Sequence, residues 1–107
     1  MTRFNDTLER LAATIELRRG ADPATSWSAK LLADRPLAAK KLAEEAVELA
    51  LAAVQNDKAA IIAESADVLY HWLAVIAGAG VTLDDVAAAL EAREGVSGVA
   101  EKASRSV

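Results

Sequence analysis

The sequence predicts an all-α protein, a bundle of about five helices in a single domain. Alanine and leucine supply most of an apolar content of 53%, and both residues favour helices. β-branched clusters, Asn-Gly turns and alternating apolar runs are scarce, so a sheet has little support. A chain of 107 residues is also too short for two independent cores, and this predicts one domain.

Two helices are expected in the first third of the chain, from about Asp6 to Arg18 and from Ser26 to Ala33. Apolar residues of the first recur at helical spacing and form one stripe: Leu8, Leu11, Ala12 and Ile15. Gly20 is a plausible C-terminal stop, and Asp22-Pro23 disfavours helix in the following loop. Thr25 or Ser26 provides the N-cap of the second helix.

Two long helices and a shorter one are expected next. Pro36 fits the first turn of a helix that continues to about Val54. The fourth helix runs from about Lys58 to Ala77. Thr82-Leu83-Asp84-Asp85 resembles a capping box and opens a fifth helix that ends near Arg93–Gly95. The short connection between the two long helices predicts that they are antiparallel neighbours, and residues 96–107 give no element.

The fourth helix is apolar nearly all round, which predicts that it is covered on every side. One copy of the chain offers only two long helices, so we expect a homodimer that completes the core. Residues 59–79 are nearly long enough to span a bilayer, but Glu64, Asp67 and His71 stand in their middle. Charged side chains at that depth are costly, so a buried helix of a soluble protein is the better interpretation.

Charge and cysteine content exclude several function classes. A net charge of −4 argues against non-specific nucleic-acid binding, which needs a basic surface, but not against a nucleotide substrate. The chain has no cysteine, so it offers no disulfide, zinc-thiolate site or thiol nucleophile. No basic-then-apolar leader opens the sequence, and we therefore expect a cytoplasmic protein.

Acidic residues at helical spacing are the most informative feature. Glu44, Glu45 and Glu48 project from roughly one face of the third helix. Glu64 and Asp67 are again three residues apart, and between residues 59 and 77 no other residue is charged. An unpaired carboxylate on an apolar helix must take a proton or find a cation. Lys40 and Lys41 cannot neutralise all of these acids, so a divalent cation with oxygen ligands, Mg²⁺ above all, is expected.

Three other interpretations of the acids have less support. Glutamates on helices are usually solvated, and Lys40–Glu44 and Lys41–Glu45 have the spacing of ordinary surface pairs. The Glu64/Asp67 pair on an apolar helix argues against that interpretation. A di-iron site needs Glu-x-x-His pairs, and the single histidine, His71, has the wrong spacing. Zinc or copper would prefer nitrogen or sulfur ligands, which are scarce here.

Glu45-x-x-Glu48 followed by Glu64-x-x-Asp67 resembles the metal motif of the all-α nucleotide pyrophosphohydrolases, the MazG-like superfamily. Other segments resemble one family of that superfamily, the phosphoribosyl-ATP pyrophosphohydrolases, in order and spacing. They are residues 26–32 (SWSAKLL), 40–48 (KKLAEEAVE), 67–71 (DVLYH), 93–98 (REGVSG) and 101–105 (EKASR). Trp27 and Ser28 stand where the family pattern has tyrosine and threonine.

The resemblance implies Mg²⁺-dependent hydrolysis of phosphoribosyl-ATP to phosphoribosyl-AMP and pyrophosphate, the second step of histidine biosynthesis, by a homodimer. It implies four metal ligands, with Glu44 in or next to their shell: Glu45, Glu48, Glu64 and Asp67. It also implies three lysines that face phosphates: Lys30, Lys40 and Lys41. Either Glu44 or Glu45 could orient or deprotonate the attacking water.

Two other functions stay open at this point. One is a house-cleaning nucleoside triphosphate pyrophosphohydrolase, which would act on plain triphosphates. The other is a non-catalytic helical dimerisation module whose acids are structural. His71 is at least as well explained as a core histidine as by a role at the site, and core or interface packing explains Trp27 and Trp72 better than base stacking does. The C-terminal tail, with Lys102 and Arg105, is expected to fold over the substrate or the partner subunit.

Overall fold

The computed structural model describes residues 2–95, 98–99 and 102, and within them it has five α-helices and no strand. The all-α prediction is therefore confirmed for this part of the chain. The helices are α1 (Arg3–Leu17), α2 (Trp27–Ala33), α3 (Arg35–Val54), α4 (Lys58–Gly78) and α5 (Leu83–Glu91). Most of the C-terminal tail, Arg105 included, lies outside the described residues, so its expected role stays a prediction.

Side-chain caps fix the helix boundaries. The backbone N–H of Ala29 donates to Ser26 Oγ at the start of α2, and the predicted capping box of Thr82 and Asp85 begins α5. Pro36 lies in the first turn of α3, as predicted. α1 begins three residues earlier than expected, because Thr2 caps it by accepting from the N–H of Asn5.

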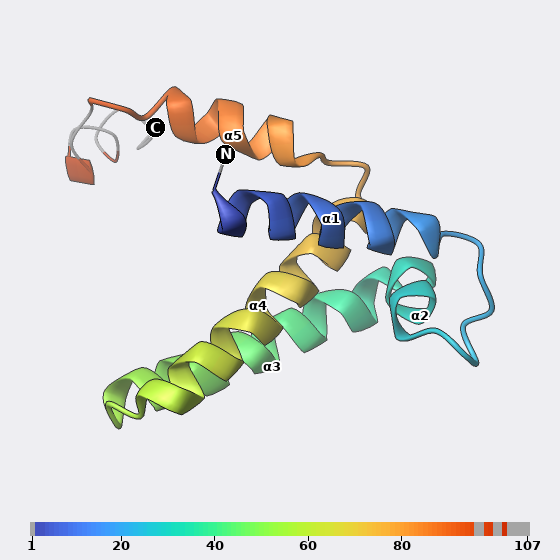
Figure 1. Ribbon diagram of the computed structural model, residues 1–107, viewed down its shortest axis with the longest axis horizontal. Coiled ribbons are helices and arrows are strands. Elements are labelled where there is room, and N and C mark those ends of the chain that lie inside the picture. The colour runs from blue at the N-terminus through green and yellow to red at the C-terminus, as the bar shows by residue number, and fades with distance from the viewer. Residues whose placement is uncertain (1, 96–97, 100–101, 103–107) are drawn as a thin grey trace.

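The two long helices, α3 and α4, form an antiparallel hairpin (Figure 1). Their connection is short: Asn56 adopts a left-handed φ of 55°, and the N–H of Asp57 returns to the carbonyl of Ala52 at 3.2 Å. Asp57 then caps α4 by accepting from the N–H of Ala60. This tight turn sets which turns of α3 and α4 face each other.

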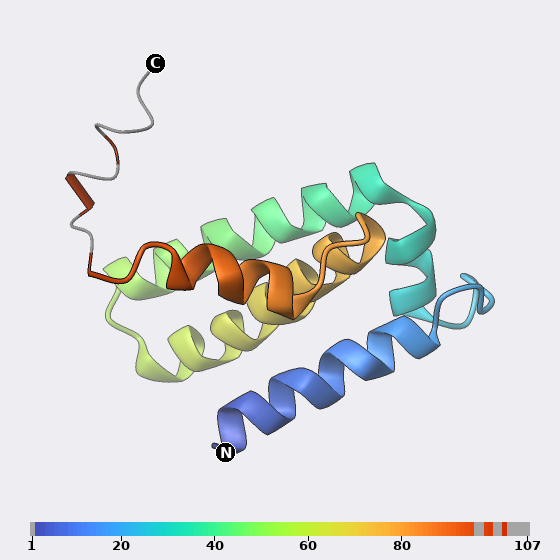
Figure 2. The ribbon, with the colours of Figure 1, turned by 90° about the horizontal axis from the view of Figure 1, so that it is seen from above.

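The three shorter helices surround this hairpin. α2 packs across one end of it and contacts both long helices, while α1 lies along α4 on the side away from α3 (Figure 2). Leu31 of α2 is fully buried in a cluster with Ala38 and Ala74, and Ile15 of α1 and Leu73 of α4 are buried as well. These contacts hold α2 and α1 against the middle and the C-terminal half of α4.

Large apolar side chains remain exposed on the hairpin. Val47, Leu51 and Val54 follow one another at helical spacing along α3, with exposed fractions of 59%, 55% and 85%. Ile62 of α4 is also exposed. Among the described residues, the fully buried large side chains are only Ile15, Leu31 and Leu73. One copy of the chain therefore buries a small core and leaves an apolar stripe on α3 uncovered.

α4 is long and apolar enough, by length and composition, to cross a membrane. It is also the helix that α1, α2 and α3 all contact, and it carries Glu64 and Asp67. Both features are typical of the central helix of a soluble bundle.

Candidate metal centre

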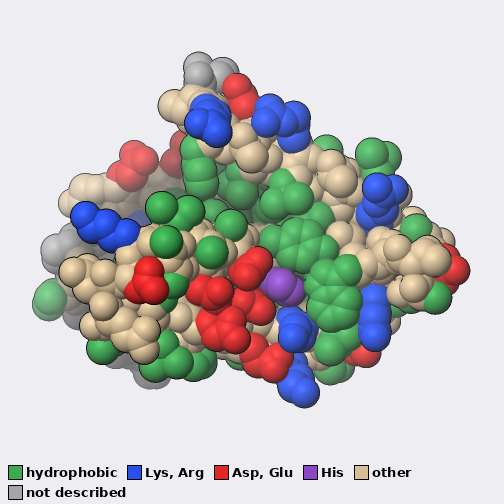
Figure 3. Space-filling model, turned by 60° about the horizontal axis from the view of Figure 1, so that its bottom comes forward, with side chains coloured by type: hydrophobic (Ala, Val, Ile, Leu, Met, Phe, Trp, Pro, Cys, Tyr) green, Lys and Arg blue, Asp and Glu red, His purple; other side chains and the backbone are tan. Residues whose placement is uncertain are grey.

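Acidic side chains from the two long helices meet on one face of the hairpin. Carboxylate oxygens of Glu45 and Glu48 on α3 and of Glu64 on α4 all lie within 4.8 Å of one another. Figure 3 shows the acidic side chains gathered on this face, beside the histidine. The antiparallel pairing of α3 and α4 thus brings together three of the four ligands expected from the sequence.

Asp67, the fourth expected ligand, lies next to this group of three and is exposed. It is one turn after Glu64 on α4, and its negative charge contributes to raising the pKa of both Glu45 and Glu64. It therefore lies at the rim of the same acidic centre, toward solvent.

The carboxylates of this centre repel one another. The neighbouring Glu48 carboxyl, which hydrogen-bonds the protonated form, raises the pKa of Glu64 to about 7, and burial and the charges of Glu48, Glu45 and Asp67 act in the same direction. Burial, followed by the charges of Glu48 and Asp67, raises the pKa of Glu45 as well. A centre with this much uncompensated negative charge is stabilised by a cation.

Two oxygens of the centre are buried without a hydrogen-bond partner. They are Oε2 of Glu45 and Oε2 of Glu64, one from each long helix. A buried carboxylate oxygen that has lost water and gained no donor is energetically costly. A hard divalent cation with oxygen ligands would satisfy both atoms, so these residues fit a magnesium ion.

Glu44 differs from its neighbour Glu45. Its carboxylate pairs with Lys41 Nζ at 3.3 Å, and it is not part of the three-carboxylate group. Neither Lys40–Glu44 nor Lys41–Glu45, the surface pairs of the competing interpretation, forms within the described residues: the Glu45 carboxylate lies with those of Glu48 and Glu64, and Lys41 pairs with Glu44. A hollow of about 330 Å³ lies beside the centre, lined by Lys41, Glu44, Glu45, Val47 and Glu48.

Lys40 and Lys30, the other expected phosphate ligands, are exposed. Lys40 makes no ion pair or hydrogen bond within the part of the chain that the structure describes. Lys30 lies over the ring of Trp27, with Nζ 5.8 Å from the ring centroid. Both ammonium groups are therefore available to an anion.

His71 links α2 to the acidic helix, a connection that sequence reasoning left open. Its Nδ1 donates to the backbone carbonyl of Asp67 at 2.8 Å, and its Nε2 accepts the indole N–H of Trp27 at 3.3 Å. A carbonyl only accepts and an indole only donates, so the ring is the neutral Nδ1–H tautomer. Only 7% of the residue is exposed. With both nitrogens engaged, His71 is a positioning residue and not a metal ligand.

A second hydrogen bond joins the same two helices. Ser28 Oγ and Tyr70 Oη are 2.6 Å apart, and the ring of Tyr70 meets that of His71 edge-on. The sequence contained a signal for the two His71 hydrogen bonds, because a lone histidine in an apolar helix needs polar partners for both ring nitrogens. What the sequence lacked was the position of α2.

Comparisons with known proteins identify chains that are similar over nearly the whole length. Residues 8–94 match the family model described as phosphoribosyl-ATP pyrophosphohydrolase. A phosphoribosyl-ATP pyrophosphatase of Caulobacter vibrioides is 65% identical over 103 residues, covering 96% of each chain. Another, from Cereibacter sphaeroides, is 60% identical over 99 residues, 92% of this chain and 96% of its own length. A third, from Caulobacter sp. strain K31, is 59% identical over 105 residues, 98% of each chain.

Proposed function

The chain belongs to the phosphoribosyl-ATP pyrophosphohydrolase family, and from that membership we propose how its own residues carry out the reaction. It is an enzyme of histidine biosynthesis that hydrolyses phosphoribosyl-ATP to phosphoribosyl-AMP and pyrophosphate. In this hydrolysis the oxygen of water bonds to a phosphorus, and the bond from that phosphorus to the α–β bridging oxygen breaks. The residues must therefore offset phosphate charge and orient a water.

Glu45, Glu48 and Glu64 hold the cofactor, Mg²⁺, and Asp67 provides a fourth carboxylate at the rim. The observation that carries this assignment is the pair of buried, partnerless oxygens on Glu45 and Glu64 beside Glu48. Bound Mg²⁺ would neutralise charge on the phosphates and on the departing pyrophosphate. Magnesium keeps part of its shell for water and substrate oxygens, which suits a centre with exposed Glu48 and Asp67.

Lys30, Lys40 and Lys41 bind the phosphates. Lys40 is exposed and unpaired among the described residues, and Lys41 is held next to the acids by Glu44. Ammonium groups here offset the charge of a triphosphate that approaches an acidic surface. The triphosphate would thus lie between the α3 lysines and the carboxylate centre.

Glu44 orients the attacking water and accepts its proton. Its carboxylate borders the hollow beside the centre and stands outside the three-carboxylate group. Glu45, in contrast, is one of the three clustered carboxylates and has a buried oxygen without a hydrogen-bond partner. A base must keep a lone pair for the water, and Glu44 is the residue of the two that does so.

The enzyme acts as a homodimer of single-domain subunits in the cytoplasm. The support for the dimer is the exposed apolar stripe of Val47, Leu51 and Val54 together with the small core of one copy. A second copy packed on this stripe would place two helices of each subunit in one bundle.

Pyrophosphate release from phosphoribosyl-ATP tests the proposal, measured with Mg²⁺, with excess EDTA, and beside plain nucleoside triphosphates. We expect turnover that requires Mg²⁺ and is confined to phosphoribosyl-ATP. Turnover of plain triphosphates would instead indicate a house-cleaning enzyme with the same metal chemistry. No turnover of any nucleotide would contradict catalysis and favour a structural bundle.

A further inference from the structure

Trp27 presents an aromatic ring beside the catalytic face. It is the first residue of α2, and 42% of it is exposed although its indole N–H is engaged with His71. Exposed tryptophan that is held in one orientation is unusual, because a ring without a ligand is normally buried more completely. The hydrogen bond fixes the ring, and the exposure leaves it open to a ligand.

The ring lies close to the acidic centre. A single side chain, His71, stands between the indole and the backbone of Asp67, through hydrogen bonds of 3.3 and 2.8 Å. Figure 3 shows the same order across the surface: acids, then the histidine, then apolar side chains, with lysines or arginines beside them. A nucleotide has a matching order, because its sugar separates the phosphates from the base.

The ammonium group of Lys30 already lies over the Trp27 ring. Lys30 Nζ is 5.8 Å from its centroid, near the outer limit of a cation–π contact. Phosphoribosyl-ATP differs from ATP by a phosphoribosyl group on the adenine base, and alkylation of a ring nitrogen of adenine gives the base a positive charge. Tryptophan is the best aromatic partner for a flat cation.

We propose that Trp27 is the platform on which the adenine ring of the substrate stacks, and that it helps the enzyme to prefer the charged, ribosylated base to neutral adenine. Stacking would displace the Lys30 ammonium from the ring toward the phosphates. His71 keeps the indole in place and so acts as a positioning residue. This inference rests on the proposed function and adds recognition of the base to it.

Substitution at Trp27 tests the platform in the full-length protein. For Trp27→Ala we expect the KM for phosphoribosyl-ATP to rise about tenfold, which corresponds to about 1.4 kcal/mol, while kcat changes less than threefold. Trp27→Tyr keeps a stacking ring and should stay within about threefold of the wild-type KM. The matched control is Trp72→Phe on α4, which should leave KM and kcat unchanged. Circular dichroism and solution mass verify that each variant folds and assembles.

Fluorescence gives a second readout that does not depend on turnover. Trp72→Phe leaves Trp27 as the only tryptophan, and Trp27→Phe leaves Trp72. Phosphoribosyl-AMP, added with Mg²⁺, should quench the first variant and not the second.

Two outcomes would overturn the platform. In the first, the wild type is active, Trp27→Ala has the same KM as the wild type, and phosphoribosyl-AMP does not quench the fluorescence of Trp27 in Trp72→Phe. The other is a Trp27→Ala variant that dissociates, which would make the ring an interface residue. An inactive wild type would instead count against the proposed function.

Discussion

A carboxylate oxygen of Glu64 on α4 lies within 4.8 Å of one of Glu48 on α3. This neighbour raises the pKa of Glu64 to about 7, from an ordinary value of 4.5. Without a metal, the two helices are therefore joined at a point where their charges repel. The proposed magnesium binding and the pH-dependent stability of the fold are consequently coupled through these two residues.

Metal-free protein should lose stability as pH rises from about 4.5 through 7. The folded state keeps a proton on Glu64 up to about pH 7, whereas the unfolded chain releases it near 4.5. Between these values the folded state holds more protons, so stability falls with rising pH. Thermal unfolding in EDTA between pH 5 and 8 measures this, and added Mg²⁺ should raise the Tm more at pH 8 than at pH 5.

Glu64→Gln is the control for this effect, because it keeps the shape of the side chain and removes the titrating group. The metal-free variant should show a flatter dependence of Tm on pH and a much smaller response to Mg²⁺. A wild-type Tm in EDTA that rises steadily between pH 5 and 8 would contradict the assignment.

Glu48→Gln and Asp67→Asn should weaken Mg²⁺ binding and lower kcat/KM by about 100-fold or more. The reason is that a bound metal ion stabilises the charge of the transition state by several kcal/mol. Helicity should not change, since both side chains are exposed. Calorimetric titration with Mg²⁺ and pyrophosphate release measure the two effects. Wild-type turnover in both variants would exclude this site.

The helix boundaries and the meeting of the α3 acids with Glu64 could be predicted for one physical reason: both depend on residues that are close in the sequence. Ser26 and the Thr82–Asp85 box cap helices through residues at most three positions away. The acids of α3 meet Glu64 because the hairpin turn is short, and short turns make antiparallel neighbours.

Contacts that depend on how separate helices dock could not be predicted in the same way. The Trp27–His71 bond joins residues 44 positions apart, and the Ser28–Tyr70 contact joins residues 42 apart. Lys41 pairs with Glu44 and not with Glu45, whose carboxylate lies with those of Glu48 on α3 and Glu64 on α4.

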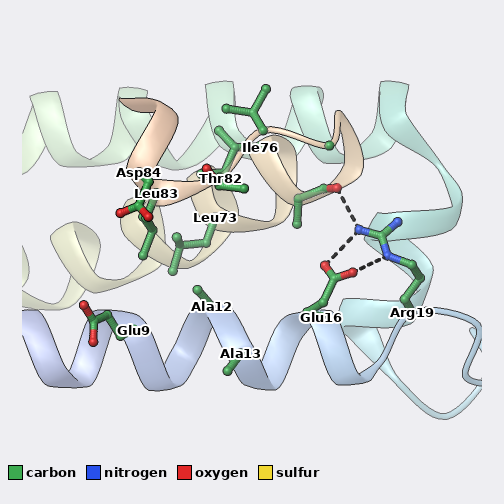
Figure 4. A pocket seen from close by; sticks show the side chains of 13 residues that line it. Glu9, Ala12, Ala13, Glu16, Arg19, Leu73, Ile76, Thr82, Leu83 and Asp84 are labelled. Atoms are coloured by element: carbon green, nitrogen blue, oxygen red, sulfur yellow. Dashed lines mark hydrogen bonds and ion pairs between the residues drawn. The ribbon is translucent and has the colours of Figure 1, made fainter. Parts of the chain in front are cut away.

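A cleft between α1, α4 and the start of α5 was not anticipated either. Its lining includes the small or apolar side chains of Ala12, Ala13, Leu73 and Ile76, which Figure 4 labels. At one end Arg19 is held by Glu16 at 2.7 Å and by the carbonyl of Ala77 at 2.8 Å. The cleft has a volume of about 530 Å³ and depends on the angle at which α5 leaves α4, which local sequence does not encode.

Lys40→Ala should raise the KM for phosphoribosyl-ATP about tenfold without changing Mg²⁺ affinity, because a charge-assisted hydrogen bond to phosphate is worth about 1.5–3 kcal/mol. The matched control is Lys58→Ala, since Lys58 is exposed at the far end of the hairpin. Steady-state kinetics at saturating Mg²⁺ separate the two variants. An equal rise in KM in both variants would show that Lys40 contributes only general positive charge and does not bind a phosphate directly.

Leu51→Glu should convert the proposed dimer to a monomer. Leu51 is 55% exposed in one copy and lies in the middle of the α3 stripe, so a carboxylate there would be buried without a partner on assembly. Light scattering at micromolar concentration should give the mass of a single chain. Leu17→Glu on α1, at a position that is 79% exposed, is the matched control and should keep the dimer mass. A wild-type protein that is already monomeric would refute the dimer.

Glu44→Gln should lower kcat by about 10²- to 10⁴-fold while Mg²⁺ affinity stays within twofold of wild type, because general-base catalysis contributes on that scale. Glu45→Gln should instead weaken Mg²⁺ binding, since its Oε2 is one of the two buried, partnerless oxygens. Lys41→Ala removes the ion-pair partner of Glu44 and tests whether that 3.3 Å contact positions the base; we expect a smaller loss of kcat than in Glu44→Gln. Calorimetry with Mg²⁺ beside single-turnover kinetics distinguishes the residues. If Glu45→Gln keeps its Mg²⁺ affinity and loses turnover while Glu44→Gln stays active, the two glutamates exchange roles and Glu45 is the base.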